Sequence, residues 1–239
     1  QIDQLGFGYE VVRSQIAAGR CRRLHEGIFL LGNMAPAFVS VRWAALLACG
    51  EGAVLSHETA AEVFTVPFPR SRWVHVCVPA DRVVVPPPGV RLHRSRLLPG
   101  KGTTYQGWPI TTPADTVLDL VGQLRAPDAV VGLITDACRT DAVAPVAILE
   151  AMGHRRRQRH RQLVKDVLCD VVGGIESPLE HKYLILVERS HGLPTGHRQV
   201  LSRMNGVTTR KDVHYDEYET VVELDGRAGA FVLRHVGTI

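Results

Sequence analysis

The sequence predicts an α+β protein built from three kinds of segment, and three observations support this. A short helical pattern ends at Gly19 and is followed by a basic hairpin of two short strands. The middle of the chain alternates helical patterns with strands that flank the turn Pro86-Pro87-Pro88. After Gly173-Gly174, a new helix precedes three strand-like runs.

Residues 1–33 form the first predicted domain, a winged helix-turn-helix. Its expected parts are a helical remnant, a tight turn, a second helix with Val11, Val12 and Ile16 on its buried face, and a hairpin, at residues 2–5, 6–8, 9–18 and 20–32. A basic hairpin that follows a helix-turn-helix corresponds to a wing. A complete winged helix has three helices, so we expect the first to be missing upstream.

Basic and amide side chains of this domain are the predicted contacts to double-stranded DNA. Arg13 and Gln15 are long enough to reach base edges or phosphates from a helix in the major groove. Arg20, Arg22 and Arg23 would hold the phosphate backbone, which gives affinity without sequence choice. The alternative is a small packing module with a solvated basic face.

Composition excludes some classes of protein and favours none strongly. The 239 residues are 45% hydrophobic and carry a formal charge of +4, which is ordinary for a globular chain. The apolar runs are far shorter than the roughly 20 residues of a membrane span, so no membrane partner is expected. The 5 cysteines are scattered without a Cys-x-x-Cys pair. We therefore expect a cytoplasmic protein with reduced thiols.

The middle domain, residues 34–153, is predicted to pack rather than react. His57 lies in the apparent capped helix start Ser56-His57-Glu58-Thr59, and His93 lies in a strand. Metal binding or acid–base chemistry is one interpretation of these histidines, but neither has a partner at ligand spacing. We expect buried or capping histidines instead.

A basic helical linker is predicted at residues 154–175. Arg155, Arg156 and Arg157 open a run of arginines that either contacts phosphates or forms a solvated helix face. The last predicted domain, residues 176–239, begins with a helix after Ser177-Pro178-Leu179-Glu180 and continues into the three strands.

Two resemblances add to this interpretation. The segments Arg20 to Leu31, Ser56 to Ala61, Gly89 to Ser95 and Pro109 to Ala114 resemble AbiEi-type antitoxins and related transcription regulators. This likeness implies a DNA-binding regulator with a cognate toxin as partner. The segments Glu176 to Glu180, Arg210 to Val213 and Val221 to Gly226 resemble the very-short-patch-repair branch of restriction-endonuclease-like proteins. This second likeness implies a partial αβββ nuclease core.

The nuclease resemblance implies a Mg²⁺ site with Asp212 and Glu223 as ligands. Asp225 shares a strand face with Glu223 and becomes the auxiliary acid, and Glu180 matches an acidic position on the preceding helix. Mg²⁺ requires few protein ligands because it retains several waters. Alternatively, Glu180 only caps its helix and Asp212 is a turn residue.

Two departures favour a degenerate nuclease domain. Glu223-Leu224-Asp225 stands where the family has Glu-x-Lys, so the lysine that stabilises the reacting phosphate is absent. Ala230 to Ile239 do not resemble the family, so we expect a C-terminally truncated core whose last strand leaves an unpaired edge, and a homodimer that covers it. The hypotheses are a DNA-binding antitoxin or regulator, a Mg²⁺-dependent endonuclease, and a toxin-neutralising interaction module.

Overall fold

The computed structural model describes residues 8–32, 34–204, 207–225 and 230–235, and side chains within these ranges except at Tyr9, 202–204, Val207, Thr209, Asp225 and 230–235. The predicted remnant helix at 2–5 lies outside this part. The mixture of helices and sheets confirms the α+β prediction. Contacts divide the chain into two units, residues 1–119 and 120–239, and each is described by itself. The predicted domain boundaries stay predictions.

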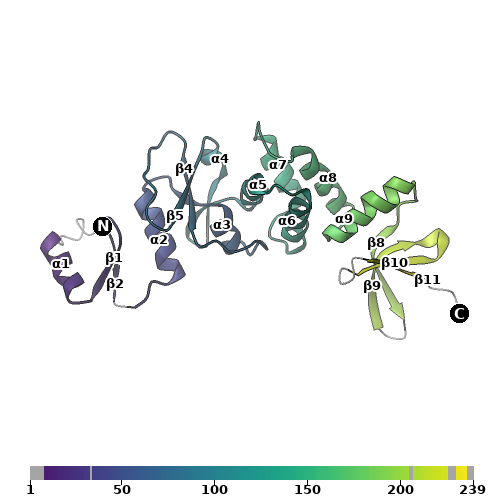
Figure 1. Cartoon of the computed structure of the whole chain (residues 1–239), viewed down its shortest axis with the longest axis horizontal. Coiled ribbons are helices and arrows are strands. Elements are labelled where there is room, and N and C mark those ends of the chain that lie inside the picture. Colours follow the sequence, from purple (N-terminus) through teal and green to yellow (C-terminus); the bar gives the residue numbers. More distant parts are fainter. Residues whose placement is uncertain (1–7, 33, 205–206, 226–229, 236–239) are drawn as a thin grey trace. The chain divides into compact units, whose positions relative to one another are not determined.

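The first unit begins with a helix and a hairpin, drawn in purple in Figure 1. Helix α1 (Tyr9–Ala17) precedes the antiparallel strands β1 (Cys21–His25) and β2 (Ile28–Leu31). Gly19, which follows α1, has a φ of 69°, a conformation that favours glycine. The expected buried face of α1 is wrong in part, since Val11 and Ile16 are 43% and 39% exposed.

A five-stranded mixed sheet forms the body of the first unit. Its order is β5-β4-β3-β7-β6, and the parallel pairs are β4 with β5 and β3 with β7. The strands are β3 (Val54–Leu55), β4 (Val74–Pro79), β5 (Val90–Ser95), β6 (Gly102–Tyr105) and β7 (Trp108–Thr111). The proline-rich turn lies between the neighbouring strands β4 and β5, which are parallel and therefore run in the same direction.

Four helices accompany this sheet in the sequence, namely α2 (Phe38–Cys49), α3 (His57–Val63), α4 (Leu98–Lys101) and α5 (Pro113–Gln123). Thr112 caps α5, because its Oγ1 accepts a hydrogen bond from the Asp115 amide at 3.1 Å. The predicted cap of α3 is wrong: Ser56 precedes the helix, but its side chain makes no capping hydrogen bond. Its hydroxyl lies 3.0 Å from His57 Nδ1 instead.

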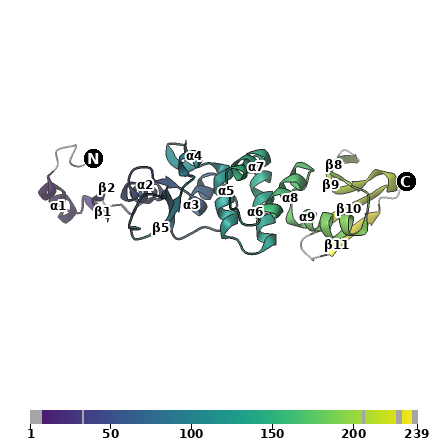
Figure 2. The same ribbon diagram turned by 90° about the horizontal axis from the view of Figure 1, so that it is seen from above.

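Three helices follow α5 in the second unit. They are α6 (Pro127–Arg139), α7 (Pro145–Gly153) and α8 (Arg161–Val172), and α8 packs on both of the others (Figure 2). Val164, Val167 and Leu168 of α8 are fully buried. The segment predicted as a linker therefore contains a helix that belongs to a core.

A four-stranded antiparallel sheet closes the second unit, in the order β11-β10-β9-β8. Before it come α9 (Pro178–Tyr183) and a π-helical turn (Leu184–Arg189), and its strands are β8 (His197–Met204), β9 (Val207–Tyr215), β10 (Thr220–Asp225) and β11 (Ala230–His235). Tyr183, Val213, Tyr215 and Val222 form a buried cluster between the helix and the sheet. Gly196 lies against this cluster, because a Cβ there would be 2.4 Å from Val213 Cγ1.

The expectation of an unpaired edge after β10 is wrong. Strand β11 pairs with β10 from Thr220↔His235 to Asp225↔Ala230, so β10 has a neighbour on each side. The resemblance did not predict this strand, because residues 230–235 do not match the family's ending. The homodimer was expected because it would cover this unpaired edge, so that reason for expecting one no longer applies.

Candidate functional site

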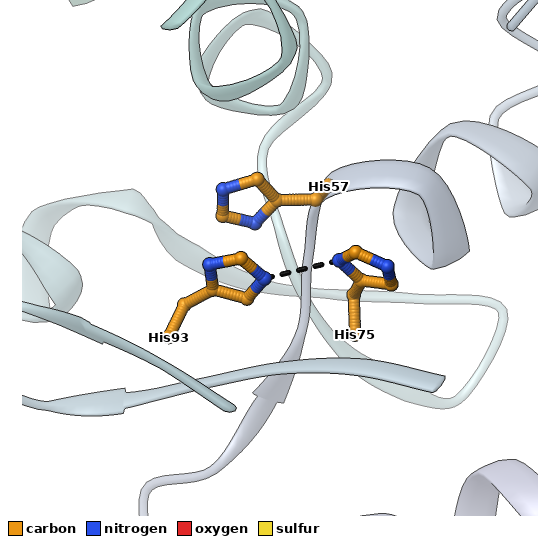
Figure 3. A group of neighbouring side chains, drawn as sticks. All are labelled: His57, His75 and His93. Atoms are coloured by element: carbon orange, nitrogen blue, oxygen red, sulfur yellow. Dashed lines mark hydrogen bonds between the residues drawn. The ribbon is translucent and has the colours of Figure 1, made fainter. Parts of the chain in front are cut away.

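Three histidines from separate elements converge in the first unit, and this histidine cluster consists of His57, His75 and His93 (Figure 3). His57 is the first residue of α3, His75 lies on β4 and His93 lies on β5. In the parallel register His75 pairs with Arg91 and Cys77 pairs with His93, so the two strand histidines project from the same face. One ring nitrogen from each histidine lies within 4.8 Å of the others.

The centre of the cluster is His75, which is 0% exposed. Its Nδ1 lies 3.0 Å from His93 Nε2 and 2.8 Å from a carboxylate oxygen of Glu58. Its Nε2 lies 3.0 Å from the Ser71 hydroxyl, and its backbone amide donates to Thr59 Oγ1 at 2.8 Å. The carboxylate favours a proton on Nδ1, so Nε2 is placed to accept from Ser71.

The outer histidines are held in their neutral forms. Burial, followed by the charge of His93, lowers the pKa of His57 to about 2. Burial, followed by the charge of His75, lowers the pKa of His93 to about 4. The two rings stack with centroids 3.6 Å apart. Neutral imidazoles keep a free lone pair at pH 7, which metal ligation requires.

Glu58 supplies the negative charge of the cluster. Burial alone would raise the pKa of its carboxyl group, but the hydrogen bond from His75, its own backbone amide and the nearby histidine charges lower the pKa to about 2. Glu58 is therefore ionised beside a buried imidazole. A carboxylate on the ring nitrogen of a histidine is the arrangement that orients histidines in metal sites and in hydrogen-bonded relays.

The arginines predicted to bind DNA from the N-terminal segment are exposed, but they do not share one face. Arg20 directly precedes β1 and Arg22 is its second residue, whereas Arg23 projects from the opposite face of the strand to Arg22. Arg23 Nε donates to the His25 carbonyl at 3.3 Å. On α1, Arg13 is exposed and Gln15 is partly buried.

The arginine run before α8 contains one residue that cannot serve as predicted. Arg155 is 8% exposed and its Nη1 donates to the Gln158 side chain, so its guanidinium group is not accessible to a phosphate. Arg161 Nη1 donates to the carbonyl oxygens of Met152 and Arg155, which draws this segment against the end of α7. Arg156 and Arg157 are exposed, and their predicted role stays a prediction.

The acids predicted to hold Mg²⁺ lie on the two central strands of the second sheet. Val213 pairs with Val222, and Asp212 and Glu223 are the next residue of each strand. One oxygen of Asp212 already accepts a hydrogen bond from the Leu224 amide at 2.7 Å. Asp225 lies on β10, but its side chain is outside the described part.

Glu180 follows the capping alternative rather than the metal alternative. Its amide donates to Ser177 Oγ at 3.2 Å, and its carboxylate accepts from the Ser177 hydroxyl, the Glu176 amide and the Gln199 side chain. These donors occupy both carboxylate oxygens. Its predicted catalytic role has no support from this geometry, because the carboxylate already has a structural function at the start of α9.

The sheet, α3 and the histidine cluster fall within the segment that a family comparison identifies. Residues 51–166 match the AbiEi antitoxin C-terminal domain. This AbiEi-like segment covers just under half of the chain and supports an antitoxin-type function. No curated protein matches the chain. Among the described residues, no helix combines the length and apolar character needed to cross a membrane.

The histidine cluster lies wholly within the AbiEi-like segment, and sequence reasoning missed it. In the sequence, His57 and His93 have no partner at metal-ligand spacing, and no ligand pattern marks His75. The three are spaced 18 residues apart, which matches no local ligand pattern. The sequence does show that His75 and His93 lie in strands on either side of one turn. This indicates a shared site only once the two strands are known to be parallel neighbours.

Proposed function

We propose that this chain is a DNA-binding, antitoxin-type transcription regulator. The observation that carries the proposal is the combination of the AbiEi-like segment with a preceding helix and basic hairpin, in which Arg13, Arg20 and Arg22 are exposed. Exposed guanidinium groups on a helix and the hairpin that follows it suit phosphate contacts, because each contact releases condensed counterions from the duplex. The helix α1 would supply whatever sequence choice the protein has.

The antitoxin part of the proposal includes a toxin protein as partner. Apolar side chains on α2 favour a protein contact, since Phe38 and Val39 are 78% and 56% exposed. Exposed apolar surface of this kind is typical of interaction sites. The pure interaction-module hypothesis differs only in that it requires no DNA contact.

We expect the double substitution Arg20→Ala/Arg22→Ala to weaken binding to mixed-sequence duplex DNA. Loss of two phosphate contacts should reduce the slope of log K against log salt by about 2, with a similar loss on every duplex sequence. Fluorescence anisotropy with a labelled duplex at several salt concentrations measures both quantities. Arg91→Ala/Arg96→Ala is the matched control, because it removes the same charge from exposed arginines of the same unit.

In that control we expect the slope to stay close to that of the unmodified protein. Equal losses in the two double variants would show that only net charge matters and would contradict a role for the hairpin. Absence of binding to any duplex at low salt would refute the DNA-binding proposal and leave the interaction module.

A second candidate function is Mg²⁺-dependent DNA cleavage. The observation that favours it is the placement of Asp212 and Glu223 on adjacent central strands. Two carboxylates and retained waters satisfy Mg²⁺, which would activate a water against a phosphodiester. The absent Glu-x-Lys lysine and the structural role of Glu180 both weigh against efficient catalysis.

If the second candidate is correct, Asp212→Asn should abolish Mg²⁺-dependent nicking of supercoiled plasmid. The amide keeps the size of the side chain but removes the charge that a Mg²⁺ ligand needs. Glu217→Gln is the control, since this exposed acid lies in the turn between the same strands. Cleavage that persists in the Asp212 variant, or absence of cleavage in the unmodified protein, would reject the nuclease function.

A further inference from the structure

We propose that the histidine cluster is a binding site for a single Zn²⁺-class transition-metal ion, with His57, His75 and His93 as nitrogen ligands and Glu58 as the adjacent carboxylate. The inference does not rest on DNA binding. Every residue it uses lies in the first unit and on three elements that the sheet register holds together.

The kinds of ligand select the kind of ion. Imidazole nitrogens suit zinc, copper, nickel and iron, whereas Mg²⁺ and Ca²⁺ require oxygen ligands. Three histidines with a water or a carboxylate in the fourth position form a common zinc arrangement. The site is thus chemically distinct from the acidic strands of the second unit.

The distances are close to those of a bound ion. Two nitrogens bound tetrahedrally at about 2.0–2.1 Å from zinc are separated by roughly 3.4 Å. His75 Nδ1 and His93 Nε2 are 3.0 Å apart, and the largest separation within the cluster is 4.8 Å. A slightly longer separation between His75 and His93 and a shorter one across the rest of the cluster would allow all three nitrogens to coordinate one ion.

The His57 ring must turn for this to happen. Ring lone pairs lie in the plane of the imidazole, and the His57 and His93 planes are 16° apart in a stack. Parallel rings stacked in this way cannot direct their lone pairs to one point. His57 is the first residue of α3, so a change in its side-chain torsion angles would leave the strands β4 and β5 in place.

Glu58 can act in either of two ways once an ion is present. Its carboxylate oxygen is 2.8 Å from His75 Nδ1, the nitrogen that faces His93, so an ion bound at Nδ1 would displace the proton between the two groups and leave the carboxylate beside the ion as a counter-charge. Alternatively, the Glu58 carboxylate could become the fourth ligand of the ion. The ion would then take the place of a proton in the cluster. In both cases its negative charge offsets part of the charge of the metal.

The test is a titration of the whole reduced chain, stripped of metal with a chelator, with Co²⁺ and then Zn²⁺ at pH 7.5. We expect the visible absorption bands of four-coordinate Co²⁺ to saturate at one equivalent, and Zn²⁺ to displace the Co²⁺. The absence of a sulfur charge-transfer band would distinguish the histidine cluster from the cysteines. A folded chain, checked by circular dichroism, that shows no such bands would overturn the proposal without any variant.

Variants then assign the ligands. His93→Gln and His57→Gln should each weaken Co²⁺ binding by more than the about 10–100-fold that loss of an outer-shell partner costs. Glu58→Gln should fall within that range if the carboxylate lies beside the ion without binding it. The control is His191→Gln, an exposed histidine of the second unit. Unchanged affinity in the His93 and His57 variants, or loss in the His191 variant, would place the metal elsewhere.

Discussion

Replacement of Glu188 by alanine is expected to lower the free energy of unfolding of the second unit by about 3–5 kcal/mol. Glu188 is 2% exposed within the π-helical turn, and its carboxylate forms an ion pair with Arg198 on β8. It also accepts a hydrogen bond from the hydroxyl of Tyr215 on β9. Its removal would leave a guanidinium group buried without a counter-charge, which is the costly part.

The tyrosines extend this buried network. The hydroxyls of Tyr183 and Tyr215 are 3.2 Å apart, and burial together with the Glu188 carboxylate raises the pKa of Tyr215. Glu188→Ala would therefore also deprive Tyr215 of its acceptor. Because hydrogen-bonded groups of this kind act together, Glu188→Ala/Arg198→Ala should cost less than the sum of the single variants.

Urea denaturation followed by far-ultraviolet circular dichroism measures this effect. The 3 tryptophans, Trp43, Trp73 and Trp108, all belong to the first unit, so their fluorescence does not report on the second. The control is Asp128→Ala, which breaks an exposed ion pair with Lys182 and should cost less than about 1 kcal/mol. A similarly small loss of unfolding free energy in Glu188→Ala would mean that water reaches Arg198 and that the network contributes little to stability.

The stability of the metal-free first unit is expected to fall as the pH drops from about 6.5 to 4.5. His57 and His93 have pKa values lowered to about 2 and about 4 in the folded chain, so they stay neutral there while the unfolded chain takes up protons below its ordinary value of 6.5. Stability therefore is fully present above pH 6.5. It decreases by at most about 1.4 kcal/mol per pH unit for each histidine.

Two features refine this prediction. His93 is partly exposed, so solvent screening makes its share smaller than that of His57. The lowered pKa of Glu58 acts in the same direction but only below its ordinary value of 4.5, where its carboxylate begins to be protonated in the unfolded chain. The window between pH 6.5 and 4.5 thus isolates the histidines.

Tryptophan fluorescence during urea denaturation, repeated at several pH values with a chelator present, measures the profile. His57→Gln and His93→Gln should each flatten the slope, because glutamine does not titrate. His191→Gln, in the second unit, should leave the slope as it is. A flat profile in the unmodified protein would mean that the histidines are protonated in the folded state and that the cluster is solvated.

Local patterns in the sequence predicted much of the fold. The helix that ends before Gly19, the basic hairpin after it and the strands on each side of the proline-rich turn follow from propensity and turn chemistry. Strand β11 could not be predicted in the same way. Its pairing with β10 is a hairpin contact between neighbouring segments, but the run from Ala230 to His235 has no alternation of apolar and polar residues that would predict a strand.

The sites were harder to predict than the elements. That Asp212 and Glu223 lie on neighbouring antiparallel strands is a local property of a hairpin, whereas their predicted role as metal ligands stays a prediction. The burial of Arg155 and the meeting of His75 with His93 are tertiary properties, set by the packing of α7 and α8 and by a parallel strand register. A single sequence gives no information about which of its arginines and histidines will turn inward.

The position of β11 has a further consequence for the second unit. With a partner on each side, β9 and β10 have their main chains anchored across the sheet, and only β8 and β11 can fray at its margins. Asp212 and Glu223 thus lie on central strands rather than on a loop. Residues on central strands have less conformational freedom to lose than loop residues, so a ligand bound by these two side chains would cost the main chain little entropy.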